Sequence, residues 1–332
     1  MIDKPRPVRI DRRQFLQTTA LLATLPSLST SAAGEKSRVI EVHRPGIIGE
    51  NLRPDSEGTQ EMLDRAMREL TGERSRKDQW SKYVSAEDVV GLKVNGLGGP
   101  QLSTKRELVQ AVIRGLVDAG VKENNIIVWE DRDAHVKAIG VDFNTGKTGV
   151  RVYSSRSDAG GHDETETHFG SGSACLSKIL TEQITALINM PIIKDHDMAG
   201  TTLSLKNLSH GITKDPGPHH DNGCDPYVAE INTIPVVGRK HRLVVVDGLR
   251  GCFDGGPTYR ENCAHNYESI LVSTDRLAID TIGTNRIEAV RRAKGLPTLA
   301  EAAHPARYLA TAARLNLGQG DTSQIEHVMI EG

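Results

Sequence analysis

The 332-residue chain has few aromatic residues and almost no net charge. Phe, Trp and Tyr make up 4% of it, which predicts a core of aliphatic side chains rather than of stacked rings. The formal net charge is −2, and residues 1–33 hold five basic and two acidic side chains, so the remainder carries −5. No basic run or interleaving of basic and aromatic residues is left there to hold a phosphate backbone. We therefore expect no nucleic-acid partner.

Long apolar runs and clustered cysteines are also missing. Beyond residue 33, no apolar run approaches the roughly 20 residues that a helix needs to cross a bilayer. Cys175, Cys224, Cys252 and Cys263 are far apart, unlike the closely spaced ligands of a four-iron ferredoxin segment. In an oxidising compartment cysteines tend to pair, and the short loop between Cys252 and Cys263 favours a disulfide there. The alternative is that all four cysteines are small buried hydrophobes.

The N-terminal segment resembles a twin-arginine export signal. Arg12 and Arg13 precede a weakly apolar run at 18–28, and the small residues 31–33 follow, which predicts cleavage after Ala33. The resemblance implies transport by the twin-arginine translocase, which carries folded proteins that often already hold a cofactor. Residues 34–332 would then be periplasmic or extracellular. The alternative is an amphipathic surface helix with a chance pair of arginines.

A βαβ unit is the best-defined pattern in the rest of the chain. It consists of a strand, a glycine-rich loop, a helix and a second strand at residues 88–94, 95–100, 104–120 and 125–129. Thr104 and Glu107 fit a capping box at the start of the helix, and Gly120 fits a left-handed cap at its end. Such a unit predicts parallel strands joined by a right-handed crossover.

The glycine-rich loop does not predict a dinucleotide site. Gly96, Gly98 and Gly99 do not follow the Gly-x-Gly-x-x-Gly spacing. The backbone N–H groups of the loop could instead bind a small anion at the start of the helix.

Apolar patterns predict the remaining elements. We expect further strands at 38–43, 149–154, 186–190, 242–247 and 269–273, and further helices at 61–70, 174–184, 276–294 and 299–315. Asp275 is expected to cap the helix that begins at Arg276. The chain is therefore predicted to be an α/β protein with a mainly parallel sheet flanked by helices. Residues 34–332 form it as one continuous region, with one or two lobes.

Groups that do chemistry are concentrated just after the strand at 186–190, which Pro191 stops. They are Lys194, Asp195, His196, Asp197, Lys206, Asn207 and His210. In open α/β sheets the ligand crevice lies beyond the carboxyl ends of the strands. The strand ends of the βαβ unit contribute further polar residues to that edge, namely Asn95, Glu130, Asp131 and His135. The loop 214–225, with His219, His220 and Cys224, is placed to fold back over the same cleft. The alternative is an ordinary solvated loop.

Five segments together resemble the family called domain of unknown function 362 (DUF362). They are the strand end at Asn95, residues 189–196, residues 202–207, the Asp247-Gly248 strand end with Gly255-Gly256-Pro257, and residues 273–280. The resemblance covers about Val89–Gly295 and is most specific in the Lys-x-His element at 194–196 and the Lys206-Asn207 pair. The residues expected to bind a cofactor are Asn95, Asp131, Asn207, Gly255 and Gly256.

A second resemblance is to the nickel-pincer lactate racemases. Residues 94–135 are similar to their N-terminal part. His196, Ala199-Gly200 and Lys206 are similar to their His, Ala-Gly and Lys segment, with the same ten-residue offset from histidine to lysine. The resemblance implies that Lys206 is the residue that holds a cofactor covalently.

General chemistry suggests a role for each candidate. Lys206 would be an attachment amine or a cation for a carboxylate, with Lys194 as a further catalytic residue. His196 or His135 would be the acid–base group. The expected metal ligands are His210, His219 and His220. For the last two, a solvated loop is the alternative.

The leading hypothesis is an exported enzyme that depends on a metal or cofactor and acts on a small anionic substrate, such as a hydroxy or oxo carboxylic acid. The cofactor would be nickel, iron or a lysine-linked organic group, and the reaction that of a racemase, an isomerase or an oxidoreductase. Two alternatives stay open. One is a non-enzymatic periplasmic protein that binds such an anion or a metal, and the other is an iron–sulfur redox protein.

The export hypothesis predicts that replacing Arg12 and Arg13 by Lys leaves the full-length protein in the cytoplasm with residues 1–33 attached. The paired arginines are the specific part of such a signal. Cell fractionation followed by intact-mass measurement tests this, with Arg9→Lys as the control for a basic residue outside the pair. Normal export and processing of the doubly substituted protein would show that the segment is not a twin-arginine signal.

Overall fold

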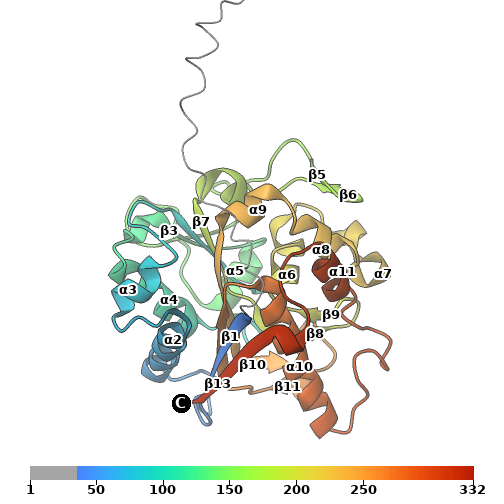
Figure 1. The fold of residues 1–332 in the computed structure, drawn as a ribbon. Coiled ribbons are helices and arrows are strands. Elements are labelled where there is room, and N and C mark those ends of the chain that lie inside the picture. The colour runs from blue at the N-terminus through green and yellow to red at the C-terminus, as the bar shows by residue number, and fades with distance from the viewer. Residues whose placement is uncertain (1–35) are drawn as a thin grey trace, which may run out of the picture. The chain divides into compact units, whose positions relative to one another are not determined.

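A mainly parallel sheet runs through the centre of the molecule, with helices on both faces (Figure 1). The computed structural model describes residues 36–332, so the predicted signal at 1–33 lies outside the described residues. Lys36–Gly332 form one compact unit. Within 36–332, an 11-stranded sheet has the main path β13-β1-β12-β10-β7-β2-β3-β4; β8 and β11 pair with β10, and β9 pairs with β8.

The strands of this sheet are β1 (Ser37–His43), β2 (Val90–Lys93), β3 (Ile126–Glu130), β4 (Arg151–Ser154), β7 (Ala186–Asn189), β8 (Ile192–His196), β9 (Gly200–Thr202), β10 (His241–Cys252), β11 (Ala264–His265), β12 (Ser269–Ser273) and β13 (Ile325–Glu331). Strands β10, β7, β2, β3 and β4 are parallel neighbours, and β12 is antiparallel to both β1 and β10. The predicted α/β fold with its mainly parallel sheet is therefore confirmed.

Both faces of the sheet are buried because successive side chains of a strand enter different cores. In β3, Ile126 and Val128 pack in one hydrophobic cluster, while Ile127 and Trp129 pack in another. Figure 1 shows α2, α3 and α4 on one side of the sheet and α6, α8, α10 and α11 on the other. The helices are α2 (Ser56–Thr71), α3 (Arg76–Ser81), α4 (Arg106–Asp118), α5 (Asp133–Ile139), α6 (Ser204–Asn207), α7 (Asp221–Cys224), α8 (Tyr227–Ile231), α9 (Pro235–Lys240), α10 (Arg276–Ala293) and α11 (Tyr308–Arg314).

Asp275 caps α10, as predicted, and also binds the first and last parts of the described region to it. One of its carboxylate oxygens accepts hydrogen bonds from the backbone N–H groups of Leu277 and Ala278, at 2.9 Å each. The other accepts from the Ser37 hydroxyl at 2.6 Å and from the Gln319 N–H at 2.8 Å. A single carboxylate thus fixes β1 and the segment before β13 against the start of α10.

The capping box predicted at Thr104 and Glu107 is wrong. Helix α4 begins at Arg106 and has no side-chain cap. The Thr104 hydroxyl instead accepts from the Asn95 N–H and donates to the Met190 carbonyl, both at 2.9 Å. The Thr104 hydroxyl therefore forms hydrogen bonds with backbone groups at two strand ends, and not with the start of the helix as the sequence pattern predicts.

The helix predicted at 174–184 is replaced by the end of a hairpin and one π-helical turn. The hairpin strands are β5 (Thr167–Phe169) and β6 (Gly172–Ala174), and the turn spans Ile179–Gln183. Ser177 lies between β6 and the turn, and its N–H donates to the Ile212 carbonyl at 2.8 Å. A helix through this region would lose that long-range bond, because its N–H groups would bond within the helix.

The last predicted helix, at 299–315, is shorter than expected. Helix α11 spans only Tyr308–Arg314. Ala303 has a left-handed backbone with φ of 65°, and Pro305 lacks an N–H group, so a continuous helix is interrupted at both positions.

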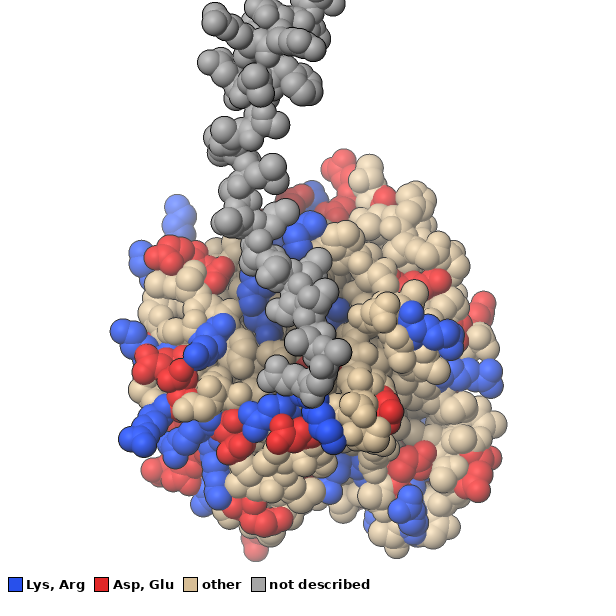
Figure 2. Space-filling view, viewed as in Figure 1, with Lys and Arg blue, Asp and Glu red and all other residues tan. Residues whose placement is uncertain are grey.

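The surface of the described region carries basic and acidic side chains together, as the small net charge predicts. On the face seen in Figure 2, basic and acidic side chains are interspersed. Within residues 36–332, no helix combines the length and the apolar character needed to cross a bilayer.

His241, at the start of β10, predicts a loss of stability in acid. Its Nε2 is buried without a hydrogen-bond partner among the described residues, although the residue as a whole is only half-buried. Burial, with help from Arg276 and Arg242, lowers its pKa well below the ordinary 6.5. The unfolded chain binds a proton as the pH falls through about 6.5, and the folded protein does not, so acid favours unfolding.

Between pH 7 and pH 5 we expect His241 to remove roughly 2 kcal/mol from the free energy of unfolding. Urea denaturation at both pH values measures this, and a His241→Gln variant should lose about that much less than the parent. His168→Gln, at an exposed position, controls for the loss of a histidine in general. Equal losses in the parent and in His241→Gln would contradict the prediction.

Candidate functional site

A cavity of about 320 Å³ lies beyond the carboxyl ends of β2 and β3. The other walls are built by the β8–β9 hairpin, by α6 and by the segment 210–220. The cavity is lined by many of the predicted site residues, namely Asn95, Asp131, His135, His196, Lys206, Asn207, His210 and His220. The predicted residues outside its lining are Lys194, His219, Gly255 and Gly256.

The polar residues after Pro191 lie in a strand, and not in the loop that a stop at Pro191 suggests. Lys194, Asp195 and His196 are all buried in β8, which pairs in parallel with β10 and antiparallel with β9. Pro191 cannot donate a hydrogen bond, but its carbonyl accepts from the Asp247 N–H at 2.8 Å, so the chain stays attached to β10. The side chains of this segment therefore have fixed positions.

A chain of buried side-chain hydrogen bonds links the strand ends to α6. The Lys194 ammonium donates to Asn95 Oδ1 at 2.9 Å, and Asn95 Nδ2 donates to Asn207 Oδ1 at 3.0 Å. Asn207 Nδ2 donates to Asn189 Oδ1 at 2.7 Å, and Asn189 Nδ2 donates to the Ser204 carbonyl and hydroxyl at 2.9 Å each. Lys194 thus acts behind the cavity wall, and burial lowers its pKa to about 8.

Asp280 of α10 holds the first turn of α6. Its two carboxylate oxygens accept from the N–H groups of Ser204 at 2.7 Å and Leu205 at 2.9 Å. These are donors that a helix start leaves without an internal partner. Complete burial raises the pKa of Asp280 to about 8, although the two N–H groups oppose that shift.

Lys206, on this turn, places its amine at the cavity wall. Its neighbours Leu205 and Leu208 are fully buried in separate hydrophobic clusters. Burial lowers the pKa of Lys206 to about 8, and the nearby Cys224 thiol opposes this. Among the described residues, Lys206 forms no ion pair with a carboxylate. The amine is therefore available to a ligand in the cavity.

His196 is a neutral imidazole whose tautomer is fixed by the backbone. Its Nδ1 accepts from the N–H groups of Met198 and Ala199, at 3.2 and 3.3 Å. Burial, then the charges of Lys206 and Lys194, lower its pKa to about 2. The 3.2 Å approach of Asp197 to the same nitrogen is therefore not an ion pair. The remaining proton is on Nε2, which makes His196 a hydrogen-bond donor.

The cavity wall at β3 is acidic but internally paired. Lys93, fully buried in β2, lies 3.4 Å from Glu130, and His135 Nδ1 lies 3.5 Å from the other carboxylate oxygen of Glu130. Burial alone would raise the pKa of Glu130, but Lys93 and His135 hold it at about 2. Asp131 is engaged by Arg156 at 3.1 Å. Neither carboxylate is left to neutralise Lys206.

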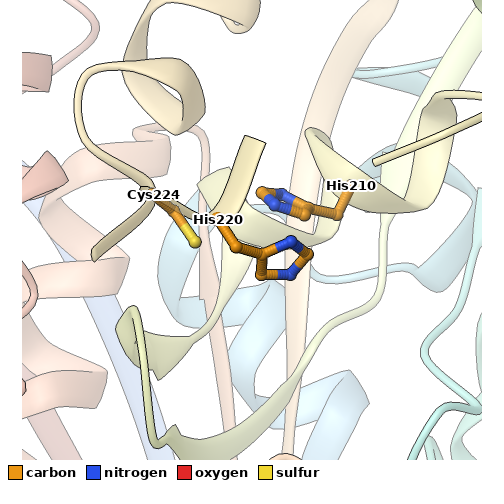
Figure 3. A group of neighbouring side chains, drawn as sticks. All are labelled: His210, His220 and Cys224. Atoms are coloured by element: carbon orange, nitrogen blue, oxygen red, sulfur yellow. The ribbon is translucent and has the colours of Figure 1, made fainter. Parts of the chain in front are cut away.

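Of the predicted metal ligands, the structure brings together two and adds a third. His210 and His220 have ring centroids 4.3 Å apart, and Cys224 lies beside them (Figure 3). His219 stacks on Tyr227 instead, with centroids 3.9 Å apart and ring planes 7° from parallel. His219 is therefore not part of this group.

The predicted disulfide between Cys252 and Cys263 is not formed, and all four cysteines are free. The Cys252 sulfur instead lies 3.2 Å from the Asp195 carboxylate and 2.8 Å from the Asp254 carbonyl, and its single proton can donate to either oxygen. Gly256 also serves this region: its N–H donates to Asp195 at 2.9 Å, and an added Cβ would lie 2.3 Å from the Asp195 carbonyl. Gly256 thus packs closely against β8.

The sequence reasoning missed Lys93, Asp280 and the role of Cys224. Lys93 follows Val90-Gly91-Leu92 in an apolar strand, and a lysine in such a strand is itself the signal, because it needs a buried partner. Asp280 sits inside a helix pattern, and nothing local indicates its contact with α6. Cys224 was expected near the cleft, but its pairing with two histidines depends on the fold.

Comparison with known proteins identifies the family. A crystal structure of a Thermotoga maritima protein is similar over 79% of this chain, with 11% sequence identity and a TM-score of 0.38. This chain covers 59% of that one, which is less than two thirds of its length. No curated protein matches. Residues 90–285, more than half of the chain, match the family model described as domain of unknown function (DUF362). The protein therefore belongs to the DUF362 family.

Proposed function

We propose that this protein is an exported enzyme that binds a small anionic substrate, of the hydroxy or oxo carboxylic acid class, beside Lys206. The observation that carries the proposal is a buried amine at the wall of a cavity, without a carboxylate partner among the described residues. An unpaired buried charge is costly, and a substrate carboxylate would compensate it.

His196 supports the acid class more specifically. As a neutral imidazole with its proton on Nε2, it can donate to a carbonyl or hydroxyl oxygen next to the carboxylate. A neutral donor in a buried site stabilises charge that develops on that oxygen without bringing a full charge of its own. Lys206 and His196 together would bind the two oxygen functions of one small acid.

His135 would be the proton acceptor of the reaction. It lines the cavity, and the Glu130 carboxylate, 3.5 Å from its Nδ1, would orient the ring. Removal and return of the proton on the carbon next to the carboxylate is one route by which a racemase or isomerase can act on such an acid. The binding-protein alternative uses the same anion site without turnover. A lysine-linked cofactor, as the racemase resemblance implies, would use the same amine.

Lys206→Met should lower the affinity for 2-hydroxy and 2-oxo carboxylates by roughly 10- to 150-fold. A hydrogen bond to a charged group contributes about 1.5–3 kcal/mol, and methionine keeps the apolar stem. Isothermal titration with a panel of such acids measures the change, and Lys122→Met, at an exposed lysine, is the matched control. Unchanged affinity in Lys206→Met, or no binding of any acid to the parent, would refute the anion site.

Turnover is tested separately by NMR in D₂O. An enzyme of the proposed kind should exchange the proton on the carbon next to the carboxylate of a bound acid for deuterium from the solvent. His196→Gln keeps a neutral donor and should therefore retain more exchange than His196→Ala. If His196 instead acted as a base, both variants would lose exchange equally. Binding without exchange or conversion would favour the binding-protein alternative. The intact mass of protein from the native host decides whether Lys206 carries a covalent group.

A further inference from the structure

Three side chains of metal-ligating types lie close together near Lys206, and two of them, His210 and His220, line the cavity. His210 belongs to the 3-10 turn His210–Ile212, His220 to the turn Gly217–His220, and Cys224 to α7. One candidate ligand atom from each lies within 4.8 Å of the others. Figure 3 shows the three side chains as neighbours.

The proton positions of His210 leave a ligand nitrogen free. The Ser209 hydroxyl donates its one proton to the Lys206 carbonyl at 2.9 Å, so it can only accept from His210 Nδ1, 3.0 Å away. The proton of His210 is therefore on Nδ1, and Nε2 has a free lone pair. That Nε2 is buried and has no hydrogen-bond partner among the described residues. A buried acceptor left without a partner costs about 1–3 kcal/mol, which a bound cation would remove.

His220 has the same arrangement. Its Nδ1 lies 3.0 Å from the Gly217 carbonyl, which can only accept, so Nδ1 carries the proton and Nε2 is free. Histidines that ligate metals usually donate their other N–H to an oxygen in this way, because the bond fixes the tautomer and the ring. In both histidines, Nε2 is therefore the ring nitrogen with a free lone pair.

Cys224 is brought to the histidines by an unusual turn. Asn222, Gly223 and Cys224 have φ values of 50°, 70° and 63°, a run of left-handed residues of which only one is glycine. The turn leaves the cysteine fully buried. A cation at this point would take the thiolate form of Cys224, with release of its proton.

We propose that His210, His220 and Cys224 bind a divalent transition-metal ion of the zinc class, which includes cobalt and nickel. Two imidazoles and a thiolate suit these ions, whereas magnesium and calcium require oxygen ligands. Three protein ligands leave a fourth position for water or substrate, as in catalytic zinc sites. This inference deepens the proposed function, because the ion would share the cavity with the substrate acid. Binding of the ion does not depend on the proposed function; only a role of the ion in turnover rests on it.

The test uses tag-free full-length protein, stripped with a chelator and titrated with Co²⁺. We expect one equivalent to bind and to give a thiolate-to-cobalt charge-transfer band in the near ultraviolet. Cys224→Ser should lose the band, and Ser209→Ala, which removes the partner of His210 Nδ1, should weaken binding by roughly 10-fold or more. Cys175→Ser and His219→Gln are the matched controls, and both should retain the band and the stoichiometry.

A second measurement covers the case in which a variant fails to fold. In the parent protein, Zn²⁺ should slow alkylation of Cys224 by iodoacetamide, as followed by peptide mass, and should leave Cys175 unaffected. The proposal is overturned if the parent gives no charge-transfer band, if Cys224→Ser keeps it, or if Zn²⁺ does not protect Cys224. No organic acid is present in these assays, so a negative result would contradict the metal site without bearing on the proposed anion site at Lys206.

Discussion

The site depends on the hydrogen bonds that hold one isolated turn of helix. Helix α6 has only four residues, and so short a helix is not stable by itself. Asp280 binds the N–H groups at its start, while Asn95 and Asn189 bind the side chain of Asn207 at its end. Every bond is buried, so the turn has no aqueous alternative to these partners. Lys206 lies between these two sets of hydrogen bonds, so its backbone position is fixed.

The charges around the cavity are separated rather than cancelled. Glu130 would be the natural partner of a buried lysine, but Lys93 and His135 already engage it. The wall at α6 therefore keeps an amine without a carboxylate, next to a histidine that is held neutral. One buried lysine, Lys93, is paired with a carboxylate and the other, Lys206, forms no ion pair among the described residues, so the cavity is acidic on one side and carries an amine on the other. Structural pairing of Lys93 is what leaves Lys206 free for ligands.

The fold could be predicted from the sequence because its signals are local. The strand at 126–130 alternates between two cores, and Asp275 caps the helix that follows it in the chain. The strand ends also indicated the edge of the sheet at which the cavity lies. The errors fall where distant groups decide the outcome. Thr104 bonds to the carbonyl of Met190 instead of capping a helix, and the chain after Pro191 rejoins β10 through a contact with Asp247.

The ligand group at His210 shows the same limit, and it also links the two proposals. Adjacent histidines in a loop suggest a pair of ligands, yet His219 stacks on Tyr227 while Cys224, four residues beyond His220, completes the group. The Cys224 thiol, together with Asp197, opposes the lowering of the Lys206 pKa by burial. A metal ion would take that sulfur as its own ligand and would bring positive charge close to the amine. Because like charges then meet at the cavity wall, an anionic substrate between the ion and Lys206 would be bound more tightly than by either group alone.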